Sequence, residues 1–258
     1  MTTPPTARPA ATENLSRTAA DDANRVRIVL HGALGRMGQR IAACAAHEPA
    51  CHIVQALDRD EALAVRRGDA EVVIDFSSDA GAVRAASIAT DLGAALLVGT
   101  TGLSASTLDQ VAAAAERVPT MVAPNTSLGV AVARRLVAEA ARLLPGFDVD
   151  IVETHHTRKL DAPSGTARHL ADAVARGSGK PLDPSRIHAI RAGDVVGDHE
   201  VVFSGPGERV TIEHTATSRD LFALGALRMA RWLARQRPGM HTADEWFEDF
   251  ARAADPAR

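Results

Sequence analysis

Hydrophobic residues are distributed differently in the two halves of this chain. From Arg25 onward, short and nearly continuous apolar runs alternate with stretches of helical periodicity. The apolar runs read VRIVLHG, HIVQALD, EVVIDFS, AALLVGTTG and TMVAPN. Continuous apolar strands that alternate with helices are typical of a parallel sheet covered on both faces. The pattern therefore predicts an α/β domain with a parallel sheet over residues 25–126.

After a helix predicted over about residues 128–144, apolar and polar positions alternate. The alternation is clear in DVDIVETHH, IHAIRAGDVVGDHEVVFSG and ERVTIEHTATS. Such runs are typical of strands with one exposed face, so we expect a second, α+β domain with a mixed sheet over residues 127–217. Helical periodicity returns at about residues 220–235. Residues 218–258 are therefore predicted to form C-terminal helices that return to the first domain.

The first 24 residues are rich in Thr, Ala and Pro and have almost no large apolar side chains. Such a segment cannot bury enough surface to offset the entropy lost on ordering, and we predict that residues 1–24 form a disordered tail. The tail lacks the apolar region of a secretory signal, and its acidic residues argue against an organelle transit peptide.

Composition excludes several functional classes. A net charge of −3 and a pI near 6.4 argue against a nucleic-acid partner or a membrane surface. The apolar runs are shorter than the roughly 20 residues of a membrane span. The cysteines, Cys44 and Cys51, lie in stretches that the pattern predicts to be buried, which argues against a disulfide framework and fits a reducing cytoplasm.

The first predicted strand leads into HGALGRMG, which has glycines at positions 32, 35 and 38. Closely spaced glycines between a strand and a helix let backbone N–H groups approach a pyrophosphate at the helix start. A tight turn without a ligand is the alternative. Asp58, at the end of the second strand, is placed to hold an adenosine ribose hydroxyl, whereas Arg59 could pair with the 2′-phosphate of NADP. Together these features predict a Rossmann-like dinucleotide-binding domain.

The stretch ETHHTRKLDAPSGT, residues 153–166, collects proton donors and cations ahead of a helix start. Histidine is the usual proton donor at neutral pH, and a lysine can anchor a carboxylate or donate a proton. Ser164, Gly165 and Thr166 would offer N–H groups and hydroxyls to an anion. The alternatives are that one of two adjacent histidines is merely exposed, and that the Ser-Gly-Thr run is only a helix cap. His169 has no clustered ligands in the sequence, so no metal centre is predicted.

The same stretch closely resembles the signature of the 4-hydroxy-tetrahydrodipicolinate reductase (dihydrodipicolinate reductase) family. GALGRMG, VVIDFS, VGTTG, APNTSLGV, RAGDVVGDHEVVF, GERVTIEHTATSR and FALGAL resemble that family as well, in order, from about residue 25 to 235. The resemblance implies reduction of 4-hydroxy-tetrahydrodipicolinate, a cyclic dicarboxylate, to tetrahydrodipicolinate in lysine and diaminopimelate biosynthesis. It also implies NADH or NADPH as the cofactor, and a homotetramer built through the sheet of the second domain, which would serve substrate binding and oligomerisation.

Carried over by motif, the resemblance implies that His155 is the proton donor and Lys159 the second catalytic group. His156, Ser164, Gly165 and Thr166 would hold substrate carboxylates. The residues that would line the cofactor come from the predicted strand ends; they are Gly32, Ala33, Leu34, Gly35, Arg36, Met37, Asp58, Arg59, Gly99, Thr100, Thr101, Ala123, Pro124, Asn125 and Thr126.

The chain departs from the family pattern in three places. The connection from Asp58 to Glu71 is short, which would open the adenosine end of the cofactor site, and Thr126 stands where an aromatic residue is common. The C-terminal DEWFEDFARAADPAR differs from the usual ending.

Two other functions stay open. A semialdehyde dehydrogenase would need a cysteine nucleophile in the second half of the chain, where none occurs. A redox sensor without catalysis would need a basic recognition element and would leave the clustered donors of residues 153–166 unexplained.

Overall fold

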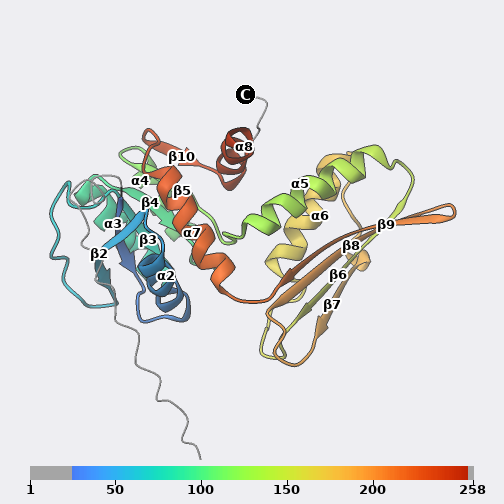
Figure 1. Cartoon of the computed structure of the whole chain (residues 1–258), viewed down its shortest axis with the longest axis horizontal. Coiled ribbons are helices and arrows are strands. Elements are labelled where there is room, and N and C mark those ends of the chain that lie inside the picture. Colours follow the sequence, from blue (N-terminus) through green and yellow to red (C-terminus); the bar gives the residue numbers. More distant parts are fainter. Residues whose placement is uncertain (1–24, 255–258) are drawn as a thin grey trace, which may run out of the picture.

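The computed structural model describes residues 25–254, which form two sheets flanked by helices (Figure 1). The tail predicted over residues 1–24 lies outside the described residues. The first sheet has the strand order β10-β5-β4-β3-β1-β2, and each neighbouring pair is parallel. Its strands are β1 (Val26–His31), β2 (Cys51–Leu57), β3 (Val72–Asp75), β4 (Ala95–Val98), β5 (Pro119–Val122) and β10 (Gly239–His241). The Rossmann-like parallel sheet predicted from the apolar runs is confirmed. Strand β10 was not predicted, because a strand of three residues is too short to produce a recognisable pattern.

Helices cover both faces of this sheet. Alternate residues of β1, such as Ile28 and Leu30, pack with one helical layer, whereas Val29 packs with the other. The first layer contains α2 (Arg36–His47), α7 (Asp220–Leu233) and α8 (Ala243–Ala253), and the second contains α3 (Asp79–Leu92) and α4 (Ala105–Ala115). Burial on both faces explains why these strands are continuously apolar. Cys51 is buried as predicted, but Cys44 on α2 is partly exposed, which corrects the sequence prediction.

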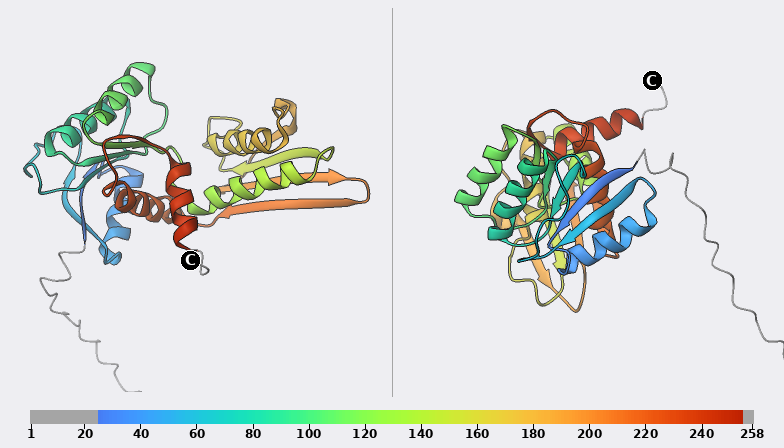
Figure 2. Two further views of the ribbon diagram at one scale, coloured as in Figure 1. Left: turned by 90° about the horizontal axis from the view of Figure 1, so that it is seen from above. Right: turned by 90° about the vertical axis from the view of Figure 1, so that its left-hand side faces the viewer.

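The second sheet is mixed and has the order β7-β6-β8-β9. Its central strand β6 pairs in parallel with β7 and antiparallel with β8, which pairs antiparallel with β9. The two helices α5 and α6 cover one face, and Figure 2 shows that the other face lies open. The elements are α5 (Leu128–Leu143), β6 (Asp148–His155), α6 (Gly165–Ser178), a short 3-10 turn (Pro184–Arg186), β7 (Ile187–Arg191), β8 (Gly197–Gly205) and β9 (Glu208–Ala216).

Helix α8 joins the two halves. Its start is fixed by a capping box between Thr242 and Glu245. Trp246 packs in the core beneath α7, while Asp244 pairs with Arg134 of α5 at 3.1 Å. The C-terminal segment that departs from the family pattern therefore contacts both sheets' helical layers. Among the helices of residues 25–254, none has the length and apolarity needed to cross a membrane.

Candidate active site

The turn after β1 brings the backbone close to neighbouring strands. Gly32 has φ of +80°, a conformation that side chains rarely adopt, and a Cβ at this position would lie 2.5 Å from the carbonyl oxygen of Phe76. A Cβ on Gly38 would collide with the Gly32 carbonyl oxygen. Both glycines are therefore required for the strand-to-helix turn itself.

The start of α2 is open to a ligand. Its N-cap is Gly35, which cannot offer a side-chain oxygen, and no side chain of residues 25–254 caps the helix. The helices α3, α4, α5 and α6 each begin instead at a serine whose hydroxyl accepts a backbone N–H bond. The first N–H groups of α2 and its positive dipole end therefore fit the pyrophosphate of a dinucleotide.

Asp58 lies directly beside this turn. Its carboxylate accepts hydrogen bonds from the backbone N–H of Arg59 at 2.8 Å and of Leu34 at 3.0 Å. These two bonds lower the pKa of Asp58, which keeps it ionised at neutral pH. Asp58 is partly exposed and Arg59 is exposed, so both can reach a ribose or its phosphate.

The other segments predicted to line the cofactor share the same sheet edge, but their side chains differ in exposure. Thr101 and Pro124 are exposed, whereas Gly99, Thr100 and Ala123 are buried. Thr126 is only 1% exposed, and its hydroxyl donates to the carbonyl oxygen of Phe222 at 2.7 Å. The Thr126 side chain thus packs against α7.

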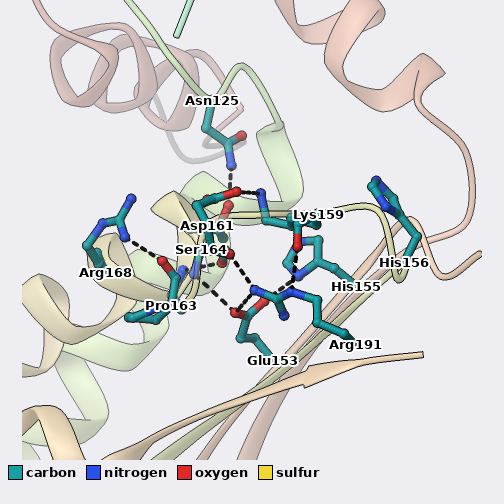
Figure 3. A network of polar contacts seen from close by, with 12 residues as sticks. Asn125, Glu153, His155, His156, Lys159, Asp161, Pro163, Ser164, Arg168 and Arg191 are labelled. Carbon is teal, nitrogen blue, oxygen red and sulfur yellow. Dashed lines mark hydrogen bonds and ion pairs between the residues drawn. The ribbon is translucent and has the colours of Figure 1, made fainter. Parts of the chain in front are cut away.

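Asn125 connects the sheet edge to the second half of the molecule. Its Nδ2 donates to Thr166 Oγ1 at 2.9 Å, and its Oδ1 accepts from the Ser127 N–H at 2.9 Å. A pocket of about 210 Å³ lies beside it between the two halves, bordered also by Arg134 and His169. The segment predicted to hold the cofactor and the turn predicted to hold the substrate are therefore in direct contact, as Figure 3 shows.

The Ser-Gly-Thr run is both a helix cap and a candidate anion site. The Ser164 hydroxyl accepts from the Ala167 N–H at 3.1 Å, which caps α6. The space around Gly165 is open, since a Cβ built there meets no atom within 4 Å. The same hydroxyl lies 3.2 Å from His199 Nε2.

His155 lies in a buried group on the inner face of the second sheet. Its Nδ1 pairs with Oε2 of Glu153, two residues earlier on β6. The other carboxylate oxygen of Glu153 accepts from Arg191 Nη2 and from the Ser164 N–H, each at 3.0 Å. Figure 3 shows the Glu153 carboxylate between these partners.

Strand register explains how the group assembles. Arg191 on β7 lies opposite His155, and His199 on β8 lies opposite Glu153. Glu153 is fully buried, and His155 and His199 are 8% and 5% exposed. The imidazole rings of His155 and His199 meet edge to face, with centroids 5.0 Å apart.

Burial shapes the protonation of these residues. It lowers the pKa of His199 to about 4, with a smaller contribution from His155, so His199 is neutral at pH 7. Burial also lowers the pKa of His155, although Glu153 acts in the opposite direction. For Glu153 itself, burial would raise the pKa, but Arg191, His155 and the Ser164 N–H together lower it.

Lys159 and His156 lie at the rim of this group. Lys159 Nζ pairs with Asp161 at 2.8 Å, and Arg191 donates to the backbone carbonyl oxygens of Lys159 and Asp161. His156 directly follows the end of β6, and Figure 3 shows that it points away from His155. Burial and the nearby cations lower the pKa of His156; these cations are Arg158, Arg219, Lys159 and Arg36.

Three residues of this site were missed by the sequence interpretation, namely Glu153, Arg191 and His199. Glu153 carried a signal, because residues two apart on a strand share a face with each other. Arg191 and His199 lie in RAGDVVGDHEVVF, which resembles the family, but that run does not place them beside His155, because their position depends on strand register. Glu153, His155 and His199 also offer ligand atoms within 4.8 Å of one another, but the Arg191 guanidinium on Glu153 opposes a cation there.

Comparison with known proteins matches both halves of the chain to one family. The family models described as "Dihydrodipicolinate reductase, N-terminus" and "Dihydrodipicolinate reductase, C-terminus" match residues 26–126 and 129–247. The 4-hydroxy-tetrahydrodipicolinate reductase of Stenotrophomonas maltophilia (strain K279a) is 43% identical over 231 residues, which cover 84% of this chain and 95% of that protein. The protein of the same name from Archaeoglobus fulgidus is 37% identical over 258 residues, covering 86% of this chain and 100% of that protein.

A solved structure shows the same fold. The dipicolinate-bound dihydrodipicolinate reductase from Paenisporosarcina sp. TG-14 has a TM-score of 0.69 and 23% sequence identity, and the match covers 84% of this chain and 97% of that one.

Proposed function

The chain belongs to the dihydrodipicolinate reductase family, and from this premise we propose that it reduces 4-hydroxy-tetrahydrodipicolinate to tetrahydrodipicolinate in diaminopimelate and lysine biosynthesis. The observation that carries the proposal is the contact between Asn125 and Thr166. It joins the sheet edge that fits a dinucleotide to the start of α6, next to the buried His155. A redox cofactor, a proton donor and an anion site are the parts that this reduction needs.

The cofactor site fits NADH or NADPH. When bound, the nicotinamide supplies the hydride. The uncapped start of α2 would hold the pyrophosphate, Asp58 would accept from the adenosine ribose, and Arg59 would face a 2′-phosphate. The remaining lining is proposed for the turn of residues 32–37 and for the strand ends at 99–101 and 123–126.

The protein supplies the proton and the charge that the substrate needs. We assign His155 as the proton donor, because it is buried beside the anion site and pairs with a carboxylate that favours its protonated form. Lys159 is assigned as the second catalytic group. Its pairing with Asp161 holds the amine at the rim, where a substrate carboxylate can take the place of the Asp161 partner.

The start of α6 is proposed to bind one substrate carboxylate through Ser164, Gly165 and Thr166, and His156 with its surrounding cations is proposed to attract the other. His199 prepares Ser164 for this role. A neutral His199 that donates from Nε2 fills the second lone pair of the Ser164 oxygen, which already accepts from Ala167. The Ser164 hydroxyl proton is then free to donate to a carboxylate.

The open face of the second sheet supports a homotetramer. It lies opposite α5 and α6 and carries Ile190, which is 46% exposed, with the partly exposed Val152 and Val202 nearby. An exposed sheet face with aliphatic side chains is suited to pairing with a second copy. We also place the enzyme in the cytoplasm, since Cys44 and Cys51 are free thiols, as a reducing compartment keeps them.

A coupled assay tests the proposed function. The unstable substrate is generated in place by the preceding enzyme of the pathway, and the loss of nicotinamide absorbance is followed with NADH and with NADPH. We expect oxidation of the cofactor that depends on the substrate and on this protein. Cofactor binding without such oxidation would contradict the proposal and favour a redox sensor.

A further inference from the structure

We propose that Glu153 is the positioning residue that couples the proton donor to the anion site, a role that rests on the proposed function. One fully buried carboxylate serves three partners from three parts of the fold. It pairs with His155 on its own strand, accepts from Arg191 at the end of β7, and accepts from the N–H of Ser164 at the start of α6.

The geometry fixes the orientation of His155. Glu153 Oε2 forms an ion pair with Nδ1, which favours a proton on that nitrogen and leaves the lone pair of the neutral ring on Nε2. Nε2 is then the nitrogen that gains and releases the transferred proton. A carboxylate that holds one nitrogen of a catalytic histidine in this manner sets the tautomer and stabilises the charged ring.

The second oxygen of Glu153 connects the donor to the substrate turn. Its bond to the Ser164 N–H fixes the residue that caps α6, and Ser164 also touches His199. The same carboxylate therefore holds both the imidazole of His155 and the residue whose hydroxyl caps α6, Ser164. A movement of that carboxylate would change the distance between the proton donor and the bound substrate.

Arg191 stabilises the ionised form of the buried Glu153 carboxylate. An isolated ionised carboxylate in this interior would be strongly unfavourable, but the guanidinium supplies a charge-assisted hydrogen bond. Arg191 also binds the carbonyl oxygens of Lys159 and Asp161, so the same side chain holds the loop that carries the second catalytic group. The group of Glu153, Arg191 and His155 is therefore one unit that links β6, β7 and the loop before α6.

The unit has a consequence for the pH dependence of the reaction. Burial lowers the pKa of His155, Glu153 acts to raise it, and Lys159 and Arg191 lower it further. A general acid works only while it is protonated, so the rate falls as the pH rises through the pKa of His155. Removing the charge of Glu153 lowers that pKa further, and the falling limb of the profile must move to lower pH.

Glu153→Gln tests the proposal because it keeps the shape and removes the charge. We expect kcat to fall by about 10²–10⁴-fold, up to the loss seen when the carboxylate behind a catalytic histidine becomes an amide. The falling limb of the pH profile should move to lower pH. Glu153→Asp keeps the charge on a shorter side chain. The falling limb of its pH profile should stay at the pH of the wild type, and its loss of kcat should be smaller than that of Glu153→Gln. Glu116→Gln, at the exposed residue that follows α4, is the matched control and should behave as wild type.

A second readout does not depend on turnover. NMR titration of the His155 ring, assigned by its absence in His155→Ala, should show a lower pKa in Glu153→Gln than in wild type. Thermal unfolding separates a variant that fails to fold from one that is folded and slow. A folded Glu153→Gln protein with an unmoved His155 titration and an unmoved pH limb would overturn the proposal. Failure of the wild type in the coupled assay would instead overturn the proposed function, while the NMR titration still tests the Glu153–His155 coupling.

Discussion

His31 Nδ1 lies 2.7 Å from Asp75 Oδ1, and the two side chains are 2% and 0% exposed. Asp75 also accepts hydrogen bonds from Ser77 Oγ and from Thr100 Oγ1, the latter at 2.6 Å. These partners come from the ends of β1, β3 and β4. The carboxylate therefore ties together the strand ends that we propose to line the cofactor site.

Loss of this buried pair should destabilise the protein strongly. Asp75→Ala leaves His31 and the Thr100 hydroxyl buried without their acceptor, and removing one member of a buried pair costs about 3–5 kcal/mol. Urea denaturation should show this loss in the free energy of unfolding. In a double-mutant cycle, Asp75→Ala with His31→Ala should cost less than the sum of the single changes. Additive single effects would show that the two residues do not interact.

His155→Ala should lower kcat by about 10²–10⁴-fold, the usual scale of general acid catalysis. Cofactor affinity should change little, because His155 lies on the second sheet. Steady-state kinetics and a separate titration of the cofactor distinguish the two effects. A variant with near-normal kcat would refute the assignment of His155 as the proton donor.

Lys159→Ala should raise KM by about tenfold to a hundredfold, since a hydrogen bond from a charged donor contributes about 1.5–3 kcal/mol. It should also lower kcat if the amine takes part in proton transfer. Pyridine-2,6-dicarboxylate has two carboxylates on a planar ring and should compete with the substrate and not with the cofactor. If the compound competed only with the cofactor, the proposed position of the anion site would be wrong.

Neither nicotinamide cofactor should be strongly excluded. Asp58 favours the ribose diol of NADH, and the exposed Arg59 favours the 2′-phosphate of NADPH. We expect catalytic efficiencies within about tenfold of each other, equal to roughly 1.4 kcal/mol. Arg59→Ala should weaken NADPH selectively, and Asp58→Ala should affect NADH more. A wild-type preference beyond about a hundredfold, or equal loss of both cofactors in Arg59→Ala, would contradict this account.

Gly225→Ala should destabilise the protein although alanine is favoured over glycine in a helix by about 1 kcal/mol. Gly225 lies on α7, and a Cβ there would collide with the backbone carbonyl oxygen of Thr126. A backbone atom cannot move aside as a flexible side chain can. Thermal unfolding should show a lower Tm than wild type, whereas Gly165→Ala, with open space around it, should cost less. A Gly225→Ala protein with a higher Tm than wild type would show that α7 shifts freely.

The sequence by itself determined the type of each half of the fold. Strands buried on both faces must be apolar throughout, which is why VRIVLHG and EVVIDFS indicated a covered parallel sheet. The glycines at positions 32 and 38 indicated the turn after β1, because a side chain at either position would clash with the backbone. Strand burial and turn conformation depend on residues that are close in the sequence, so they can be predicted without a structure.

Only the tertiary structure decided the composition of the site around His155. Arg191 and His199 reach it because β7 pairs in parallel with β6 and β8 pairs antiparallel, and a shift of one residue would turn their side chains to the open face. The packing of Thr126 against α7 and the three-residue strand β10 were likewise decided by contacts between segments about 100 residues apart in the chain. Such contacts leave no periodic pattern in the sequence, because they depend on where the chain returns and not on what precedes it.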